Sequence, residues 1–363
     1  MHVVIRTDAS ILIGSGHVMR CLTLASRLRK HGHKVSFICR DHTGNLIAQI
    51  ARAGFDFVVL PALTEAVAND NSDDYSAWLG VDQVTDADQT RAAINSQPDW
   101  LIVDHYGIDR QWEQKLRSAT GKILVIDDLA NRSHDCDLLL DQNYSTTPDR
   151  RYAELVPSGC TRLIGPTYAL LRPEFAEVRE TLDTGSRGER INVFFGGVDA
   201  TGETIKFLDA LTDGGFEECR FDVVVGGKNQ RRNRILKLAS HHGSVSIHEN
   251  VENMAELFGR ATIALGAGGT TVWERCCLGL PSVLVSVAEN QVTISKEVEA
   301  AGAAIYLGKA QEVSGTDMAQ TVADLLQDTA RLERMRTVAL GLTDGSGCER
   351  VVAALTKAVG VPT

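Results

Sequence analysis

The sequence lacks the cysteine and histidine spacings that characterise metal centres and redox-active pairs. Its eight cysteines include no C-x-x-C pair, and its ten histidines form neither an H-E-x-x-H nor an H-x-x-x-H pattern. We therefore expect no metal and no other cofactor. The thiols are expected to be reduced and structural, as they are in a cytoplasmic protein.

An excess of basic residues and a long apolar segment are also missing. The formal net charge is −10, which argues against broad, non-specific binding to nucleic acid. No apolar run approaches the length of a membrane span, and the chain enters a predicted strand at once, without the apolar core of a signal peptide. The sequence thus predicts a cytoplasmic protein that binds neither nucleic acid nor membrane, and we expect it to be a monomer.

Prolines are few and unevenly placed. Only 8 occur in 363 residues, and half of them lie within 144–187, a segment that we interpret as the interdomain connection. A chain of this length is too long for one ordinary core and suits two domains. The predicted parts are an N-terminal domain at 1–165, a linker at 166–188, a C-terminal domain at 189–345, and at 346–363 a final helix that packs back on the N-terminal domain.

What the sequence does have is a regular alternation of short apolar strands and amphipathic helices. This pattern indicates an α/β fold with parallel sheets covered on both faces. In such sheets ligands bind beyond the carboxyl ends of the strands. Polar residues occupy these ends in the first half of the chain: Asp8, His17, His105, Tyr106, Asp127, Asp128 and Asn143.

The stretch from Arg6 to Arg20 connects a predicted strand to a predicted helix through Gly14 and Gly16, and His17 stands where the helix begins. A glycine-rich turn lets a ligand approach backbone N–H groups and the positive end of the helix dipole. A histidine there can transfer a proton near neutral pH. The stretch is not the dinucleotide fingerprint G-x-G-x-x-G. We interpret it as an anion-binding turn with an acid–base residue; a capping or surface histidine is the alternative.

A second glycine-rich strand end, Gly266–Thr271, opens a predicted helix in the second half of the chain. Backbone N–H groups in such a turn bind phosphate without a charged side chain. Glu274 follows Thr270 by one helical turn, where its carboxylate can accept hydrogen bonds from the two hydroxyls of a ribose. The alternative for Glu274 is a first-turn acid that complements the helix dipole.

Motifs distributed over nearly the whole chain occur in a fixed order. They are R-T-D-A-S-x-x-I-G-S-G-H-x-x-R-C (6–21), D-H-Y (104–106), I-D-D-L-A-N-R (126–132), D-L-L-L-D-Q-N (137–143), G-P-x-Y-A-L-L-R-P-E-F (165–175), F-F-G-G-V-D (194–199), G-A-G-G-T-T-x-W-E-R-C-C-L-G-L-P (266–281) and N-Q (290–291). Together they resemble the UDP-2,4-diacetamido-2,4,6-trideoxy-β-L-altropyranose hydrolases of the pseudaminic acid pathway. More broadly, they resemble the GT-B nucleotide-sugar enzymes.

The resemblance implies a GT-B fold, in which two Rossmann-like domains with parallel sheets face each other across a cleft. It implies metal-independent hydrolysis of a UDP-sugar at the anomeric carbon, with C–O cleavage and inversion. By position, His17 is the acid–base residue that handles the attacking water, and Tyr106 lines the sugar and diphosphate region. Asp8 either orients His17 or only caps a turn.

The resemblance also implies which residues bind the substrate. Glu274 matches the acid that binds the ribose, the turn at 268–270 matches the diphosphate site, and uracil is expected near 251–254. The expected substrate-binding residues are Gly14, Gly16, Arg20, Gly197, Val251, Met254, Gly268, Gly269, Thr270, Glu274, Asn290 and Gln291.

Three other functions remain open at this point. A GT-B glycosyltransferase would use the same nucleotide site but transfer the sugar to an acceptor, and a UDP-sugar epimerase would return a UDP-linked product. A nucleotide-sugar binding protein would have no turnover, which the intact His17 argues against. The first-domain loops are mostly polar and acidic, which favours water or a small soluble acceptor, and we expect loops 63–85 and 105–110 to decide which sugar is bound.

Overall fold

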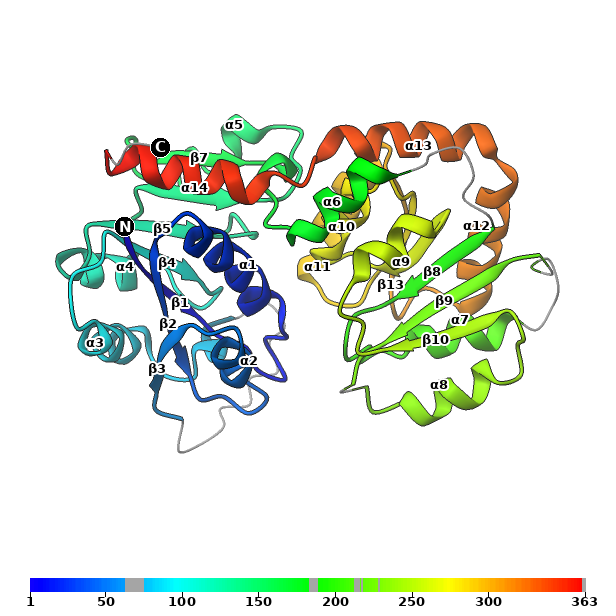
Figure 1. The fold of residues 1–363 in the computed structure, drawn as a ribbon, viewed down its shortest axis with the longest axis horizontal. Coiled ribbons are helices and arrows are strands. Elements are labelled where there is room, and N and C mark those ends of the chain that lie inside the picture. Colours follow the sequence, from blue (N-terminus) through cyan, green and yellow to red (C-terminus); the bar gives the residue numbers. More distant parts are fainter. Residues whose placement is uncertain (63–74, 183–188, 212–215, 217, 228, 361–363) are drawn as a thin grey trace. The chain divides into compact units, whose positions relative to one another are not determined.

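The computed structural model describes residues 1–62, 75–182, 189–211, 216, 218–227 and 229–360. The chain divides into two compact units. The first unit is Met1–Leu171 together with Ser346–Thr363, and the second unit is Arg172–Gly345. Each unit holds one parallel β-sheet with helices packed on it (Figure 1).

The first unit contains a seven-stranded sheet in the order β3-β2-β1-β4-β5-β6-β7. Its strands are β1 (His2–Thr7), β2 (Lys34–Arg40), β3 (Asp56–Leu60), β4 (Trp100–Asp104), β5 (Lys122–Ile126), β6 (Leu138–Asp141) and β7 (Thr161–Ile164). Its helices are α1 (Gly16–Lys30), α2 (Ile47–Arg52), α3 (Gln83–Ala93), α4 (Arg110–Leu116), α5 (Pro148–Arg151) and α14 (Gly347–Ala358), with 3₁₀ turns η1 (Tyr75–Leu79), η2 (Arg117–Ala119) and η3 (Pro166–Tyr168).

Two hydrophobic cores cover the two faces of this sheet. Val3 and Ile5 of β1 lie in the core that contains α1 and α14, whereas Val4 lies in the core that contains Trp112 of α4. Successive side chains of a strand point to opposite faces, so a strand buried on both sides needs an unbroken apolar run. This burial explains why the strands of the sequence do not alternate between apolar and polar residues.

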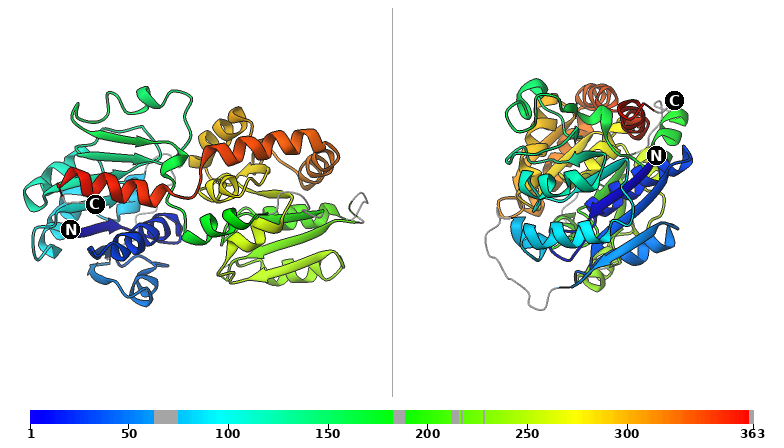
Figure 2. Two further views of the ribbon diagram at one scale, coloured as in Figure 1. Left: turned by 45° about the horizontal axis from the view of Figure 1, so that its top comes forward. Right: turned by 90° about the vertical axis from the view of Figure 1, so that its left-hand side faces the viewer.

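The C-terminal helix α14 packs against α1 in the first unit (Figures 1 and 2). Val351, Val352 and Leu355 of α14 belong to the same core as β1. The indole N–H of Trp100 donates to the carbonyl of Leu355 over 3.2 Å, which fixes α14 to the start of β4. The end of the chain is thus part of the unit that its beginning forms.

The second unit contains a six-stranded parallel sheet in the order β10-β9-β8-β11-β12-β13. Its strands are β8 (Arg190–Phe194), β9 (Arg220–Val225), β10 (Val245–Glu249), β11 (Ile263–Ala267), β12 (Ser282–Ser286) and β13 (Ala304–Lys309). Its helices are α6 (Pro173–Thr181), α7 (Glu203–Ala210), α8 (Arg232–Ala239), α9 (Met254–Arg260), α10 (Thr271–Cys277), α11 (Asn290–Ala301), α12 (Gly315–Gln327) and α13 (Thr329–Leu342).

The predicted α/β class with parallel sheets is confirmed, but the interpretation of 144–187 as a connection is wrong. This segment contains β7, which pairs with β6 and forms an edge of the first sheet. Thr161 and Arg162 of β7 are exposed there, so the strand has no apolar run that would have revealed it. Within the predicted linker, 166–171 belong to the first unit, Pro173–Thr181 forms α6 in the second, and 183–188 lie outside the described residues.

Candidate active site

The first candidate site lies where the strand order of the first sheet reverses direction. The chain proceeds from β1 to β2 and β3 on one side of β1, and β4 then pairs with its other side. In open α/β sheets, ligands bind beyond the carboxyl ends of the strands at such a reversal. Thr7 and Asp104, the last residues of the two strands, are directly paired. The polar residues that follow these strands therefore meet.

The turn after β1 brings His17 to this position. Ser10 organises the turn, because its hydroxyl accepts the backbone N–H groups of Leu12 and Ile13 and its carbonyl accepts that of Gly14. Gly14 has a φ of +78°, which disfavours any residue with a Cβ. The helix α1 then begins at Gly16 and carries His17 in its first turn, as the sequence predicts.

His17 is held by Asp104. The Nδ1 atom of His17 lies 2.6 Å from Oδ1 of Asp104, and the His17 side chain is only 8% exposed. Burial by itself would raise the pKa of Asp104, but the charges of Arg20 and His17 hold it well below its usual range. A carboxylate partner requires Nδ1 to carry the proton, so Nε2 is the basic nitrogen. Within the part of the chain that the structure describes, Nε2 of His17 has no hydrogen-bond partner.

Arg20 links this pair to a second carboxylate. Its Nε and Nη2 atoms both donate to Asp104 over 2.7 Å, and Nη1 donates to Asp128 over 2.5 Å. The hydroxyl of Tyr106 donates to the same Oδ2 atom of Asp128 over 2.7 Å. Burial and the charge of Asp128 raise the pKa of Tyr106 well above its ordinary value, so Tyr106 is a neutral donor. Its ring stands edge-on to His17, with 4.5 Å between the ring centroids.

The structure corrects the expectation that Asp8 orients His17. Oδ1 of Asp8 lies 2.6 Å from Nη1 of Arg6. The same oxygen accepts the backbone N–H of Arg40, the last residue of β2, over 2.6 Å. Burial would raise the pKa of Asp8, but Arg6 holds it well below its usual range. Asp8 therefore supports the β1–β2 edge. The residue that contacts His17 is Asp104 at the end of β4, on the other side of β1.

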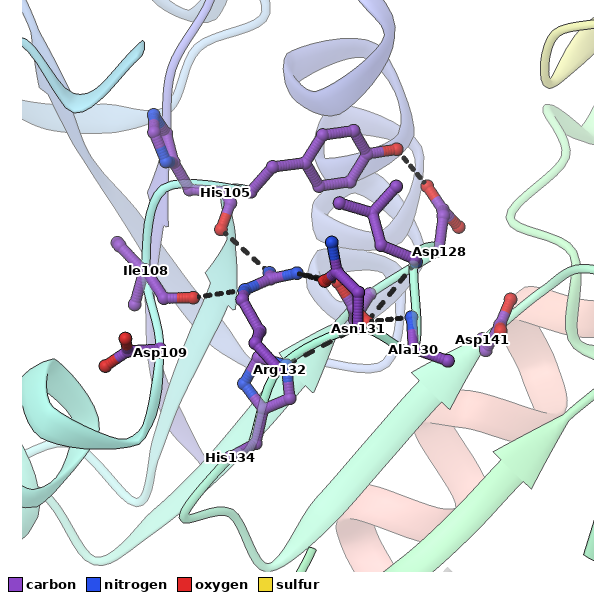
Figure 3. Close-up of polar contacts among 12 residues, drawn as sticks. His105, Ile108, Asp109, Asp128, Ala130, Asn131, Arg132, His134 and Asp141 are labelled. Atoms are coloured by element: carbon purple, nitrogen blue, oxygen red, sulfur yellow. Dashed lines mark hydrogen bonds and ion pairs between the residues drawn. The ribbon is translucent and has the colours of Figure 1, made fainter. Parts of the chain in front are cut away.

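A buried ion network fixes the loop after β5, which carries Asp128 (Figure 3). Asp127 pairs with Arg132 over 2.7 Å and accepts the backbone N–H of Ala130, whose φ is +50°. Nδ1 of His134 lies 2.7 Å from Glu113, and its Nε2 lies 3.9 Å from Asp127. Burial would lower the pKa of His134, but the neighbouring carboxylates of Asp127 and Glu113 raise it to about 9. His134 is therefore a buried cation that supports the loop.

The second candidate site lies at the corresponding reversal of the second sheet, between β8 and β11. Gly196 and Gly197 follow β8, while Gly266–Ala267 end β11 and lead into the turn 268–270. A Cβ on Gly266 would lie 2.2 Å from the carbonyl oxygen of Phe194, so the two strands require glycine there. A Cβ on Gly226, at the end of β9, would lie 2.1 Å from the carbonyl oxygen of Gly197. Glycines from three strand ends thus converge.

Gln291, in the first turn of α11, lies against the turn between β11 and α10. A Cβ on Gly268 would collide with the hydroxyl of Ser295 at 1.9 Å, whereas a Cβ on Gly269 would lie 3.6 Å from Nε2 of Gln291. The side-chain oxygen of Gln291 accepts the backbone N–H of Val287 over 3.0 Å, which fixes its orientation. Asn290 is the first residue of α11, and Thr270 precedes the first residue of α10.

Glu274 and the segment 251–254 are connected by Arg172. An Nη atom of Arg172 lies 3.6 Å from Glu274, and another donates to the carbonyl of Glu252 over 3.0 Å. The Glu274 side chain is 16% exposed, and burial raises its pKa despite the opposing charge of Arg172. Met254 begins α9 and is buried, and Val251 is half-buried beside it.

The predicted site residues thus fall into separate groups. His17, Arg20 and Tyr106 come together in the first unit, and most of the others lie around the glycine turn of the second unit. Sequence reasoning missed the role of Asp104, although the D-H-Y motif contains it, and the pairing of Asp128 with Arg20 and Tyr106. Their position at the ends of β4 and β5 was the available signal.

Comparison with known proteins adds to this geometry. Residues 208–347 match the model of the glycosyltransferase family 28 C-terminal domain. The chain is 27% identical over 299 residues to an uncharacterized protein of Methanocaldococcus jannaschii, with 80% of this chain and 57% of that protein covered. It is 26% identical over 293 residues to the UDP-2,4-diacetamido-2,4,6-trideoxy-β-L-altropyranose hydrolase of Campylobacter jejuni, with 80% and 93% covered.

Among solved structures, MurG of Acinetobacter baumannii superposes with a TM-score of 0.67 at 15% identity, with 98% of this chain and 99% of that one covered. The chain has the GT-B fold. The expected α/β fold with one parallel sheet in each of two domains is confirmed, and so is the resemblance to the hydrolase family. The described residues contain no group of three or more His, Cys, Asp or Glu arranged to hold a metal ion. None of the helices of the described residues has the length and apolar character that a membrane span requires.

Proposed function

We propose that this protein hydrolyses a UDP-linked 2,4-diacetamido-2,4,6-trideoxy hexose at the anomeric C–O bond, with inversion, and releases UDP and free sugar. The similarity to the Campylobacter hydrolase supports the substrate class. The observation that carries the reaction is the His17–Asp104 pair, because it leaves Nε2 of a nearly buried imidazole as a base without a hydrogen-bond partner among the described residues.

In the proposed reaction, Nε2 of His17 accepts a proton from water as the water oxygen attacks the anomeric carbon. The bond between that carbon and the phosphate oxygen breaks, and UDP leaves with the electron pair. Attack opposite the leaving group inverts the configuration. Asp104 stabilises the imidazolium that forms, since its own carboxylate stays ionised beside Arg20. UDP is a good leaving group, so one histidine suffices where ordinary glycosidases use two carboxylates.

The second unit is proposed to bind the UDP moiety. Backbone N–H groups of Gly269 and Thr270 would bind the diphosphate. The N–H of Gly268 donates to the carbonyl of Val285 over 3.3 Å, so Gly268 would contribute by shaping the turn. Glu274 would accept hydrogen bonds from the ribose hydroxyls. Its contact with Arg172 also connects it to the segment 251–254, the expected uracil site.

Roles for the remaining residues are proposed in the same way. Asn290 and Gln291 would complete the diphosphate and sugar site from the start of α11, and Gly197 would leave room at the end of β8. Gly14 and Gly16 would leave room for the substrate in the first unit, since nothing lies within 4 Å of a Cβ placed on either. Arg20 would act through Asp104 and Asp128, to which it is bound.

A glycosyltransferase is the second candidate, favoured by the match to the glycosyltransferase family 28 C-terminal domain. Incubation of the protein with the UDP-diacetamido-trideoxy sugar, without an acceptor, separates the two functions. We expect stoichiometric UDP and free sugar, and release of both that is slower by about 10²- to 10⁴-fold in the His17→Ala variant. Failure of the wild-type protein to release sugar until an acceptor is added would identify a transferase, and a new UDP-linked sugar would identify an epimerase.

A further inference from the structure

An aromatic cluster lies beside His17. The proposed reaction does not use this cluster. Trp78 and Tyr106 are stacked, with 5.6 Å between ring centroids and an interplanar angle of 23°. Tyr75 meets both rings edge-on, at 4.7 Å and 5.1 Å. The His17 ring stands edge-on to Trp78 at 6.4 Å. The base proposed for the reaction is therefore bordered by the rings of Trp78 and Tyr106, and Tyr75 packs against both of these rings.

The position of this cluster is fixed by its backbone. Tyr75 and Trp78 belong to η1, which is anchored by the fully buried Leu79. A Cβ on Gly107 would lie 2.7 Å from the carbonyl oxygen of Tyr75, so η1 packs directly against the residue that follows Tyr106. The Tyr106 ring is itself held by the hydrogen bond to Asp128. Such preorganised rings bind a ligand at little cost in conformational entropy.

Trp78 differs from the other tryptophans of the chain. All four lie in the described part of the chain; Trp100, Trp112 and Trp273 are fully buried, whereas Trp78 is only partly buried. Its indole N–H has no hydrogen-bond partner among the described residues, while those of Trp100 and Trp112 donate to Leu355 and Asp86. A partly exposed indole with an available N–H, beside a catalytic base, offers an apolar face and a donor to a ligand.

We propose that Trp78 is a specificity-determining residue that packs on the N-acylated deoxy sugar of the substrate and donates its indole N–H to an acetamido carbonyl. Such a sugar presents a methyl group at C6 and acetamido methyl groups where an ordinary hexose presents hydroxyls. An aromatic face favours these methyl groups, whereas it would leave hydroxyls without hydrogen bonds. The inference rests on the proposed function, since it concerns the sugar that His17 would act on.

Fluorescence of Trp78 gives a direct test of contact. In the His17→Ala variant, which is expected to bind the UDP-sugar without turnover, the partly exposed Trp78 should dominate quenching by acrylamide. We expect the UDP-diacetamido-trideoxy sugar to protect this fluorescence and UDP alone to leave it unprotected. A His17→Ala, Trp78→Phe double variant should show no protection. Equal protection by UDP would overturn the inference, because Trp78 would then contact the nucleotide; binding of the UDP-sugar without protection would also overturn it.

Kinetics of Trp78 variants test specificity. We expect Trp78→Ala to lower kcat/KM for the UDP-diacetamido-trideoxy sugar about tenfold to a hundredfold, mainly through KM, and to leave inhibition by UDP unchanged. Activity on UDP-N-acetylglucosamine, however low in the wild type, should fall less, and Trp78→Phe should restore part of the loss. Phe57→Ala, at a half-exposed aromatic of β3, is the matched control and should retain wild-type kinetics.

The two levels of inference fail in different ways. If the wild-type protein hydrolyses the diacetamido substrate and Trp78→Ala lowers kcat/KM equally for both substrates, or for neither, the role of Trp78 is wrong and the proposed function stands. If the wild-type protein hydrolyses neither substrate, the proposed hydrolysis is wrong, and the fluorescence measurement decides the contact with the sugar.

Discussion

The two sheets of this protein share a strand order around the point of reversal, but they place opposite kinds of polar group there. In the first unit, ionisable side chains gather after β1 and β4: His17, Arg20, Asp104 and Asp128. In the second unit, glycines gather after β8, β9 and β11, where a Cβ on Gly226 or Gly266 would overlap the backbone of a neighbouring strand end. The topology decides where a ligand binds, and the local residues decide whether that place suits proton transfer or anion binding.

The comparison also shows how each unit keeps its site stable. In the first unit, burial would favour the protonated form of Asp104 if the positive charge of Arg20 did not stabilise the carboxylate. In the second unit, a buried arginine, Arg275, donates to the carbonyl of Ala267 over 2.6 Å and to the Thr271 hydroxyl over 3.0 Å. This arginine braces the backbone around the glycine turn, so its charge serves the structure of the turn.

The largest effect is expected from removal of the proposed base. His17→Ala should lower kcat by about 10²- to 10⁴-fold, since it removes the proton acceptor, and should leave the Kd for UDP unchanged, since UDP binding is assigned to the second unit. Steady-state kinetics and calorimetric titration with UDP check the two parts. Unchanged turnover would refute the catalytic role of His17. A large loss of UDP affinity would contradict the assignment of UDP binding to the second unit alone.

A smaller loss is expected when the partner of His17 is neutralised. Asp104→Asn should lower kcat about tenfold to a hundredfold with little change in KM, because an amide neither fixes Nδ1 as the donor nor stabilises an imidazolium. Asp109→Asn is a matched control, since Asp109 caps α4 and asparagine also caps helices. Equal kinetics for the two variants would show that Asp104 serves only to hold Arg20.

Paired glycine substitutions test the second site. Gly269→Ala should leave stability unchanged and weaken UDP binding about tenfold, because its Cβ meets Gln291 at an ordinary 3.6 Å but stands in the way of a phosphate. Gly268→Ala should destabilise the fold by about 1–3 kcal/mol, since its Cβ overlaps the Ser295 hydroxyl at 1.9 Å. Thermal unfolding and UDP titration distinguish the effects, with Gly341→Ala in α13 as a control whose Cβ meets nothing. Full UDP affinity in Gly269→Ala would place the diphosphate elsewhere.

Replacement of His134 is expected to have the smallest effect on activity. It should instead change how the stability depends on pH. Its folded pKa of about 9 exceeds the ordinary 6.5, so its stabilisation, about 3 kcal/mol, is fully present below pH 6.5 and is lost as the pH rises through about 9. His134→Gln should therefore flatten the pH dependence of the thermal midpoint in this window. His241→Gln, at an exposed histidine, should leave the dependence as it is. A wild-type midpoint that is constant across the window would contradict a buried charged His134.

Local features of the site could be predicted from the sequence, whereas its long-range contacts could not. Gly14, Gly16 and His17 are close in the chain, and a glycine turn before a helix is visible in the residue order. The contact of His17 with Asp104 joins residues 87 positions apart, and it depends on β4 pairing with β1. Asp8 was the nearer carboxylate in sequence, but its backbone position directs it toward β2.

The same contrast between local and long-range features holds for the prediction of the fold. Buried strands such as β4 and β5 are unbroken apolar runs and were predicted, and the half-exposed edge strand β7 was not. Trp78 lies in η1, within the segment 63–85 that was predicted to be a loop. Its stacking on Tyr106 depends on the packing of η1 against Gly107, which no local pattern reveals.

Hydrolysis in H₂¹⁸O tests the central claim most directly, namely that His17 of the first unit activates water at the anomeric carbon. The protein is incubated with the UDP-diacetamido-trideoxy sugar in labelled water, and the products are analysed by mass spectrometry and NMR. We predict label on the anomeric oxygen of the free sugar, inverted configuration in the first product formed, and unlabelled UDP. Label in the phosphate of UDP would contradict the account, because water would then have attacked phosphorus.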